Sequence, residues 1–141
     1  HLQNQVEVRT DSRGLVVTLL SDKSYYDSGS AELRPETKKI RDEVAVFLRK
    51  NDNQIRVEGN TDNVPISTPR YPTNWELSTA RAVNVVRYLH DVDRIAPTRL
   101  SAAGYGEYRP RADNATPAGR QANRRVDIVL LNAGISREEN G

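Results

Sequence analysis

The chain has 141 residues, a length that suits one domain with a single hydrophobic core rather than two. Hydrophobic residues make up 36% of the chain and charged residues 28%, but the net charge is only +2 at pH 7, which argues against nucleic acid as a partner. Cysteine is absent, which excludes disulfides, a thiolate nucleophile and a sulfur-ligated zinc.

The first predicted element is a β-hairpin. Apolar runs at 6–8 and 15–20 flank the turn sequence Asp11-Ser12-Arg13-Gly14, and Gly14 allows the positive φ that a tight turn requires. After a polar loop, apolar residues at 40, 44, 47 and 48 recur with helical spacing, and Pro35 suits the first turn of a helix. We therefore expect an amphipathic helix from Pro35 to about residue 50.

A half-buried strand and a second helix come next. Residues 54–59 alternate apolar and polar side chains, and three prolines exclude regular structure from the loop 60–73. Thr73 or Asn74 can cap a helix that starts there. We expect its buried face to consist of Leu77, Ala80, Val83 or Asn84, Val86 and Leu89.

The remaining elements complete one sheet. Residues 100–103 predict a short strand that ends at Gly104, and 118–121 a short helical turn. Residues 126–131 are apolar apart from Asp127, which is typical of a central strand. The order of elements predicts an α+β or α/β sandwich with two main helices on one sheet. We divide the chain into a hairpin and linker (1–24), a main domain (25–132) and a flexible tail (133–141).

Two charged residues are candidates for ligand binding. Asp62 follows a strand end, where open sheets place ligand sites, and Arg81 lies in the next helix. A carboxylate and a guanidinium that face one pocket can hold a ligand with both an ammonium and a carboxylate. Taken alone, each has a structural explanation: Asp62 could close an Asx-turn, and Arg81 could be a solvated helix residue.

Other polar and aromatic residues allow two readings. In a strand, Arg124 and Arg125 would point to opposite faces, either as a basic edge in solvent or with one of them bracing a loop or pairing with Asp62 or Asp113. For Trp75, the only tryptophan, core packing is favoured over ligand stacking, and for Tyr105 we also favour structural packing.

No motif predicts catalysis, a metal or a cofactor. Only His1 and His90 are histidines, and no nucleophile elbow, zinc motif, P-loop or dinucleotide fingerprint occurs. No apolar run approaches the roughly 18 residues that span a bilayer. Because the chain contains no methionine, we expect it to be a fragment whose membrane or export segment lies upstream.

Four segments resemble the OmpA-like peptidoglycan-binding domain. They are 58–63 (EGNTDN), 74–82 (NWELSTARA), 104–110 (GYGEYRP) and 119–128 (GRQANRRVDI), in the order and spacing of the family. The NWELS phrase is most similar to the MotB subgroup of flagellar stator proteins. The resemblance implies a βαβαβ sandwich with one mixed sheet behind two main helices, and noncatalytic binding of diaminopimelate in the peptidoglycan stem peptide.

The resemblance also assigns roles to individual residues. It implies that Asp62 meets the ammonium of diaminopimelate and Arg81 its carboxylate. It further implies that five residues line or brace the pocket: Thr61, Asn63, Leu77, Ala80 and Arg124. Family members usually carry His where this chain has Asn60, whose amide can form hydrogen bonds but does not titrate.

The resemblance implies partners and a location as well. We expect a periplasmic or extracytoplasmic domain of a protein held in the cytoplasmic membrane, with peptidoglycan as its ligand. The subgroup implies a homodimer and a MotA-type ion-channel subunit as partner of the full-length protein. The alternative is a wall anchor of an outer-membrane protein or lipoprotein without a motor role.

Overall fold

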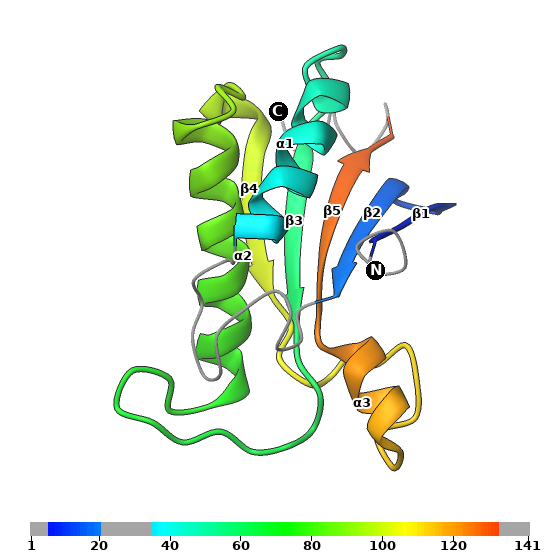
Figure 1. Cartoon of the computed structure of the whole chain (residues 1–141), viewed down its shortest axis with the longest axis vertical. Helices are drawn as coiled ribbons and strands as arrows, with labels where there is room; N and C mark the ends of the chain where they lie inside the picture. Colours follow the sequence, from blue (N-terminus) through cyan, green and yellow to red (C-terminus); the bar gives the residue numbers. More distant parts are fainter. Residues whose placement is uncertain (1–5, 21–34, 133–141) are drawn as a thin grey trace.

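A computed structural model describes residues 6–20 and 35–132, which form one sheet with helices packed on it (Figure 1). The predicted loop before Pro35 and the predicted tail after residue 132 lie outside the described residues. The elements in chain order are β1 (Val6–Asp11), β2 (Gly14–Leu20), α1 (Pro35–Leu48), β3 (Ile55–Asn60), α2 (Asn74–Asp91), the 3₁₀ turn η2 (Pro97–Arg99), β4 (Leu100–Gly104), α3 (Pro117–Asn123) and β5 (Arg125–Leu131).

The five strands form a mixed sheet in the order β1-β2-β5-β3-β4. Strand β5 pairs antiparallel with both β2 and β3, whereas β3 and β4 are parallel. Its largely apolar sequence correctly predicted that β5 is central. The predicted α+β fold, with one mixed sheet, two main helices and an N-terminal hairpin, is confirmed. The hairpin extends the sheet, because β2 pairs along its whole length with β5.

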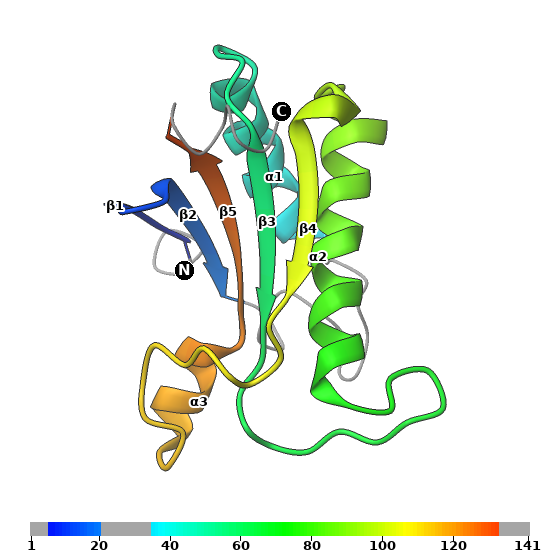
Figure 2. The ribbon, with the colours of Figure 1, turned by 180° about the vertical axis from the view of Figure 1, so that it is seen from behind.

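Helices α1 and α2 cover one face of the sheet. Seen from behind, in Figure 2, the opposite face carries no helix of the described part of the chain. The main core lies between the sheet and these helices, where side chains of β2, β3 and β5 meet those of α1 and α2. Its fully buried members include Ala45, Leu48, Ile55, Val57, Ala82, Val85, Leu89 and Ile128.

The buried face of α2 differs from the predicted one. Leu77 and Leu89 are buried as expected, but the positions between them that face the core are Ser78, Arg81, Ala82 and Val85. Of the predicted alternatives Val83 and Asn84, Val83 is 36% exposed and Asn84 is half-buried. Phe47 of α1 is also exposed, at 44%. The buried face thus combines small residues, Ser78 and Ala82, with larger ones.

Two glycines allow α2 to approach the sheet closely. A Cβ atom on Gly59 of β3 would lie 2.0 Å from the Ser78 carbonyl oxygen, and a Cβ on Gly104 of β4 would lie 2.1 Å from Thr79 Oγ1. No side chain fits at either position without moving the helix. Because Gly59 and Gly104 are partners in the parallel β3–β4 pair, both strands meet α2 at the same level.

Replacing Gly59 with alanine should therefore destabilise the domain. The added methyl meets backbone, which cannot rotate away, so we expect a loss of at least about 1–3 kcal/mol in the free energy of unfolding, measured by urea denaturation. Ala102→Ser at an exposed position of β4 is the control and should change stability little. Equal stability of Gly59→Ala and the parent would contradict the close contact.

The hairpin turn contains an ion pair that depends on pH. The carboxylate of Asp11 accepts hydrogen bonds from the Arg13 backbone N–H (2.8 Å) and from its guanidinium Nη2 (2.6 Å). These bonds, chiefly those from the side chain, lower the pKa of Asp11 to about 2. Arg13 also pairs with Glu58 of β3, which is 1% exposed, so the turn is tied to the sheet.

Stability should decrease in acid partly through Asp11. Its pKa is lower in the folded chain than the ordinary 3.8, so the ionised form stabilises the fold above pH 4, and this contribution is lost as the pH falls from about 4 to about 2. Urea unfolding of the parent and Asp11→Asn should differ at pH 7 and converge near pH 2. A difference that is the same at both pH values would contradict this assignment.

Candidate functional site

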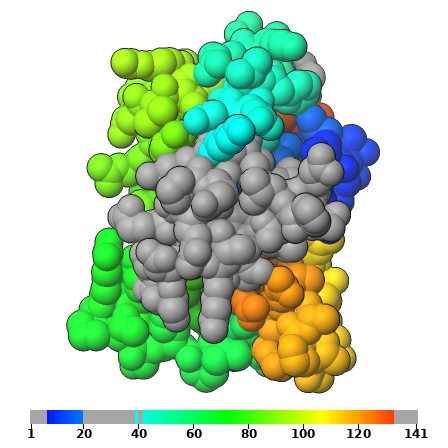
Figure 3. Space-filling model, in the orientation of Figure 1, coloured from blue at the N-terminus to red at the C-terminus, as the bar shows by residue number. Residues whose placement is uncertain are grey.

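Several loops and helix ends meet at the carboxyl ends of β3 and β4. The loop 61–73 and the start of α2 follow β3, while the segment 105–116 and α3 follow β4. Figure 3 shows the residues of the 61–73 loop and of α3 at the same end of the molecule. Strand ends of this kind are where open sheets bind ligands. The predicted site residues belong to these segments.

Asp62 lies just past the end of β3 and is 7% exposed. Its Oδ1 accepts a hydrogen bond from the Val64 backbone N–H (3.0 Å), which is an Asx-turn, and its Oδ2 accepts one from Arg124 Nη1 (2.7 Å). The structural explanation of Asp62 and the predicted pairing with Arg124 therefore both hold. An ionised carboxylate has about four lone-pair sites, so two remain for a further donor.

Arg124 reaches Asp62 because α3 ends beside it. Thr116 caps α3 by accepting from the Gly119 N–H (3.0 Å), Pro117 occupies the first turn, and Arg124 is the capping residue at the other end. The condition for Arg124 and Arg125 to alternate across one strand is not met, since β5 begins at Arg125 and Arg124 precedes it. A helix end and a strand orient the two side chains independently.

Arg125 has a different role. Its guanidinium donates to Asp127 Oδ2 (3.3 Å) and to the Arg109 carbonyl (3.1 Å), so it braces the sheet and the segment after β4. Burial is the main cause that lowers its pKa, which the charge of Asp127 partly offsets.

Arg81 lies on the buried face of α2 and is 7% exposed. Asn74, at the start of the same face, donates its amide hydrogens to the carbonyls of Asp62 (3.4 Å) and Val64 (3.1 Å). Arg81 is seven residues further on, about 10 Å along the helix axis. Because helical side chains lean toward the N-terminus, we expect the Arg81 side chain to extend toward the end of α2 that holds the Asp62 loop.

The other predicted residues differ in exposure. Thr61 is buried, and both its hydroxyl and its N–H are used, in bonds to the carbonyls of Asp62 (2.8 Å) and Gly106 (2.8 Å). Leu77 is buried against Tyr71, and Ala80 packs at the edge of this pair. Asn63 is exposed on the loop. Their roles in lining or bracing the site stay predictions.

Asn60, where the family usually has His, is 2% exposed at the end of β3. Its amide nitrogen makes a long hydrogen bond (3.5 Å) to the Glu58 carbonyl, and its Oδ1 is buried without a partner among the described residues. The neutral amide is therefore part of the floor of the site rather than its surface.

Asn123 is a structural anchor that the sequence did not reveal. It is fully buried, and its Oδ1 accepts from the backbone N–H groups of Arg111 (2.8 Å) and Ala112 (2.9 Å). Its amide donates to the Ala112 carbonyl (2.9 Å) and to Asn114 Oδ1 (2.8 Å). One side chain thus fastens the segment after β4 to the end of α3, directly before Arg124. Asn74 was missed in the same way, since it was considered only as a helix cap.

Trp75 is not a core residue, which corrects the favoured prediction. It is 47% exposed and stacks on Tyr108, 63% exposed, with ring centroids 5.0 Å apart. The reason lies in the capping box that starts α2: Thr73 accepts from Trp75 N–H and Glu76 bonds back to Thr73, which turns position 75 outward. Tyr105 packs under the Arg109 guanidinium, 3.8 Å from its ring centre, and has the structural role expected.

Within residues 6–20 and 35–132, no group of three or more His, Asp or Glu side chains could hold a metal ion. None of the helices in that part of the chain is long and apolar enough to cross a membrane. The fold and the charged groups at the strand ends define a small α+β domain suited to hold a polar, charged ligand.

The chain belongs to the OmpA family, whose model matches residues 25–124. It is 39% identical to motility protein B of Bacillus subtilis over 136 residues, which is 96% of this chain and 52% of that protein. The chain thus spans about half the length of the Bacillus subtilis relatives that it matches.

Two solved structures support this relationship. The cell wall anchor of the T6SS from Pseudomonas aeruginosa superposes with a TM-score of 0.82 and 38% identity, over 92% of this chain and 90% of that chain. A putative MotB-like protein from Desulfovibrio vulgaris gives a TM-score of 0.82 and 31% identity, over 92% and 80% of the two chains. The predicted likeness to the MotB subgroup is confirmed.

Asn123→Ala should loosen the site without touching its charged groups. The change removes the acceptor of two part-buried backbone N–H groups, and each lost hydrogen bond costs about 0.5–1.5 kcal/mol, so we expect about 1–3 kcal/mol lower stability in urea denaturation. Amide exchange should speed up at residues 111 and 112 in particular. Gln121→Ala at an exposed position of α3 is the control. Unchanged stability of Asn123→Ala would contradict its role as an anchor.

Proposed function

We propose that this domain binds peptidoglycan without catalysis, through diaminopimelate of the stem peptide, and so anchors a flagellar motor stator to the cell wall. The observation that carries the proposal is a pair of buried opposite charges, each 7% exposed. Asp62 lies just past the end of β3, and Arg81 lies on the buried face of α2, the next helix in the chain. The relationship to motility protein B supports the stator role.

The chemistry of the ligand matches these two groups. The free end of diaminopimelate carries an ammonium and a carboxylate on one carbon atom. The Asp62 carboxylate has lone pairs left after its bonds to Val64 and Arg124, and these accept from the ammonium. The Arg81 guanidinium remains charged at any physiological pH and can hold a carboxylate in a bidentate manner.

Arg124 orients the acid. Because its guanidinium already donates to Asp62, it holds the carboxylate in place before the ligand arrives. It also reduces the net negative charge that the ammonium meets. We therefore assign Arg124 a positioning role beside Asp62 rather than a direct grip on the ligand.

The rest of the proposal concerns the whole protein. We place the domain in the periplasm or another extracytoplasmic space, as a homodimer in a longer protein that works with a MotA-type ion-channel subunit. A second candidate is a wall anchor without a motor role, and the likeness to the T6SS cell wall anchor favours it. Restoration of swimming by the full-length gene in a stator-deficient strain would distinguish the two.

Asp62→Ala and Arg81→Ala should each abolish co-sedimentation with insoluble peptidoglycan. Removing one partner of a buried charged contact typically costs about 2–5 kcal/mol, which is at least about a thirtyfold loss of affinity. Peptidoglycan with lysine in place of diaminopimelate lacks the carboxylate for Arg81, so the parent should bind it more weakly and Arg81→Ala should lower that binding little further.

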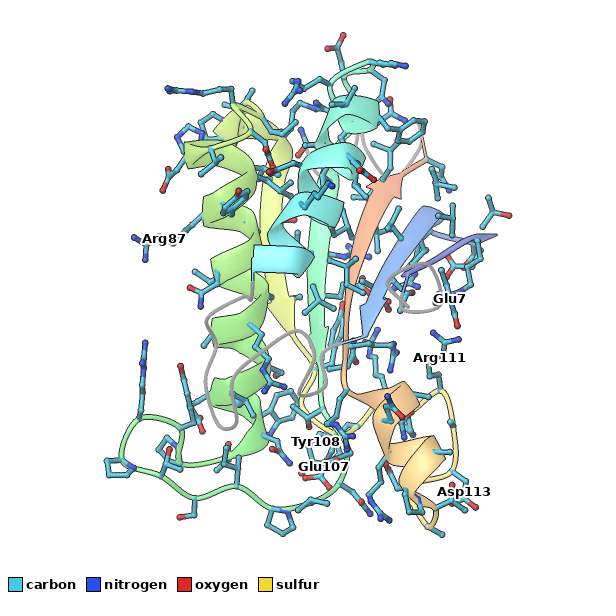
Figure 4. The ribbon with its side chains drawn as sticks, in the orientation of Figure 1. Glu7, Arg87, Glu107, Tyr108, Arg111 and Asp113 are labelled. Atoms are coloured by element: carbon cyan, nitrogen blue, oxygen red, sulfur yellow. The ribbon has the colours of Figure 1, made fainter. Side chains whose placement is uncertain are left out.

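Two exposed residues of α2 give matched controls. Arg87 points away from the domain in Figure 4, and Asp91 is 60% exposed at the end of the helix, so Arg87→Ala and Asp91→Ala should bind like the parent. Thermal unfolding verifies that each variant is folded. If folded Asp62→Ala and Arg81→Ala sediment with peptidoglycan like the parent, the site is wrong. Release of soluble fragments from purified sacculi would contradict the noncatalytic assignment.

A further inference from the structure

An exposed aromatic strip lies beside the charged site. Trp75 at the start of α2 stacks on Tyr108 of the segment after β4, with planes inclined by 27°. In Figure 4, Tyr108 lies at the strand-end side of the domain, near the beginning of α2. Two large aromatic rings so exposed contribute nothing to the core, and exposed aromatic surface of this kind typically marks a binding site.

Next to Trp75 the surface of α2 is hollowed. A cavity of about 550 Å³ is bounded by three turns of the helix, through Trp75, Glu76, Thr79 and Val83, and by Arg70 and Tyr71 of the 61–73 loop. From residue 75 to residue 83 the helix rises about 12 Å, a length that fits an extended chain of small rings better than one compact ligand.

The lining of this hollow suits a neutral, hydroxylated ligand. Arg70 and Glu76 carry opposite charges, so the hollow has no excess charge for an anion or a cation, and apolar and hydrogen-bonding side chains alternate along it. Tyr71 is 4% exposed, and its hydroxyl is buried without a hydrogen-bond partner among the described residues. A ligand hydroxyl or acetamido group that reached it would remove the penalty of an unsatisfied polar group.

The strip is joined to the Asp62 site by direct contacts. Asn74, the neighbour of Trp75, donates to the Asp62 carbonyl (3.4 Å). Gly106, two residues before Tyr108, accepts from the Thr61 N–H (2.8 Å) and donates its own N–H to Ser78 Oγ (3.0 Å). A ligand held at Asp62 is therefore adjacent to the aromatic pair.

We propose that the Trp75–Tyr108 pair and the adjoining hollow bind the N-acetylated sugars of the peptidoglycan glycan strand. The apolar C–H face of a pyranose ring packs on an aromatic ring, whose negative face attracts it. The third residue of a stem peptide is joined to its sugar by a linkage of about three residue lengths, roughly 10 Å. This inference therefore rests on the proposed function, in which the peptide is held at Asp62. Gripping the peptide at Asp62 places the sugar within reach of Trp75.

The test separates sugar from peptide. Trp75 is the only tryptophan, so intrinsic fluorescence reports directly on the strip. Peptide-free glycan chains, made by amidase treatment of peptidoglycan, should change the fluorescence of the parent in a saturable manner. In calorimetric titrations with these chains, Trp75→Ala and Tyr108→Ala should lower affinity at least tenfold, whereas Trp75→Phe, which keeps a ring, should lose less.

Control variants keep this proposal distinct from the one on which it rests. Asp62→Ala should bind peptide-free glycan with the affinity of the parent but should no longer bind the sugar-free stem tripeptide. Folded Tyr108→Ala should bind the tripeptide like the parent but should lose affinity for the glycan. Val92→Ala removes an apolar side chain that is 53% exposed elsewhere and should change neither. Parental glycan affinity in both aromatic variants, or no saturable response of the parent, would overturn the proposal. The proposal would also be overturned if Trp75→Ala changed the protein from dimer to monomer and left glycan binding unchanged, because the strip would then be a protein interface.

Discussion

The close contact of α2 with β3 and β4 is the constraint on which the rest of the structure depends. It exists because Gly59 and Gly104 leave no Cβ atom between the strands and the helix. Ser78 belongs to the buried face of the helix, and its hydroxyl accepts from the N–H of Gly106, whose carbonyl in turn accepts from the N–H of Thr61. The packing of the helix and the arrangement of the loops around Asp62 thus have one physical cause.

The charges of the site are held by separate elements that meet only in the folded domain. Asp62 follows a strand, Arg124 caps the end of α3, and Arg81 lies in α2. Each guanidinium and carboxylate is partly or fully removed from water, so each is positioned before a ligand binds, and little ordering remains to be done. Asn123 holds the segment after β4 in place through its hydrogen bonds to backbone N–H groups, as the Asx-turn of Asp62 does for the loop after β3.

Much of the fold could be predicted because its elements are determined locally. Gly14 sets the hairpin turn, Pro35 the start of α1, and Thr73 with Glu76 the start of α2. The pairing of Arg124 with Asp62 was among the alternatives that the sequence offered. The outward position of Trp75 was not anticipated, because an aromatic residue at a helix start has the same sequence signature whether it faces the core or solvent. The anchoring role of Asn123 had no signal in residue type at all.

The sequence by itself determined the order of helices and strands, the central place of β5 and the membership of the OmpA family, and it named the acid and base that we propose for the site. These follow from periodicity, turn residues and motifs, which are properties of neighbouring positions. Only the tertiary structure decided which face of α2 is buried, that Arg124 reaches Asp62, and that Trp75 and Tyr108 form an exposed strip beside a hollow. These depend on contacts between residues far apart in the chain, and no local pattern encodes the distance at which a helix rests on its sheet.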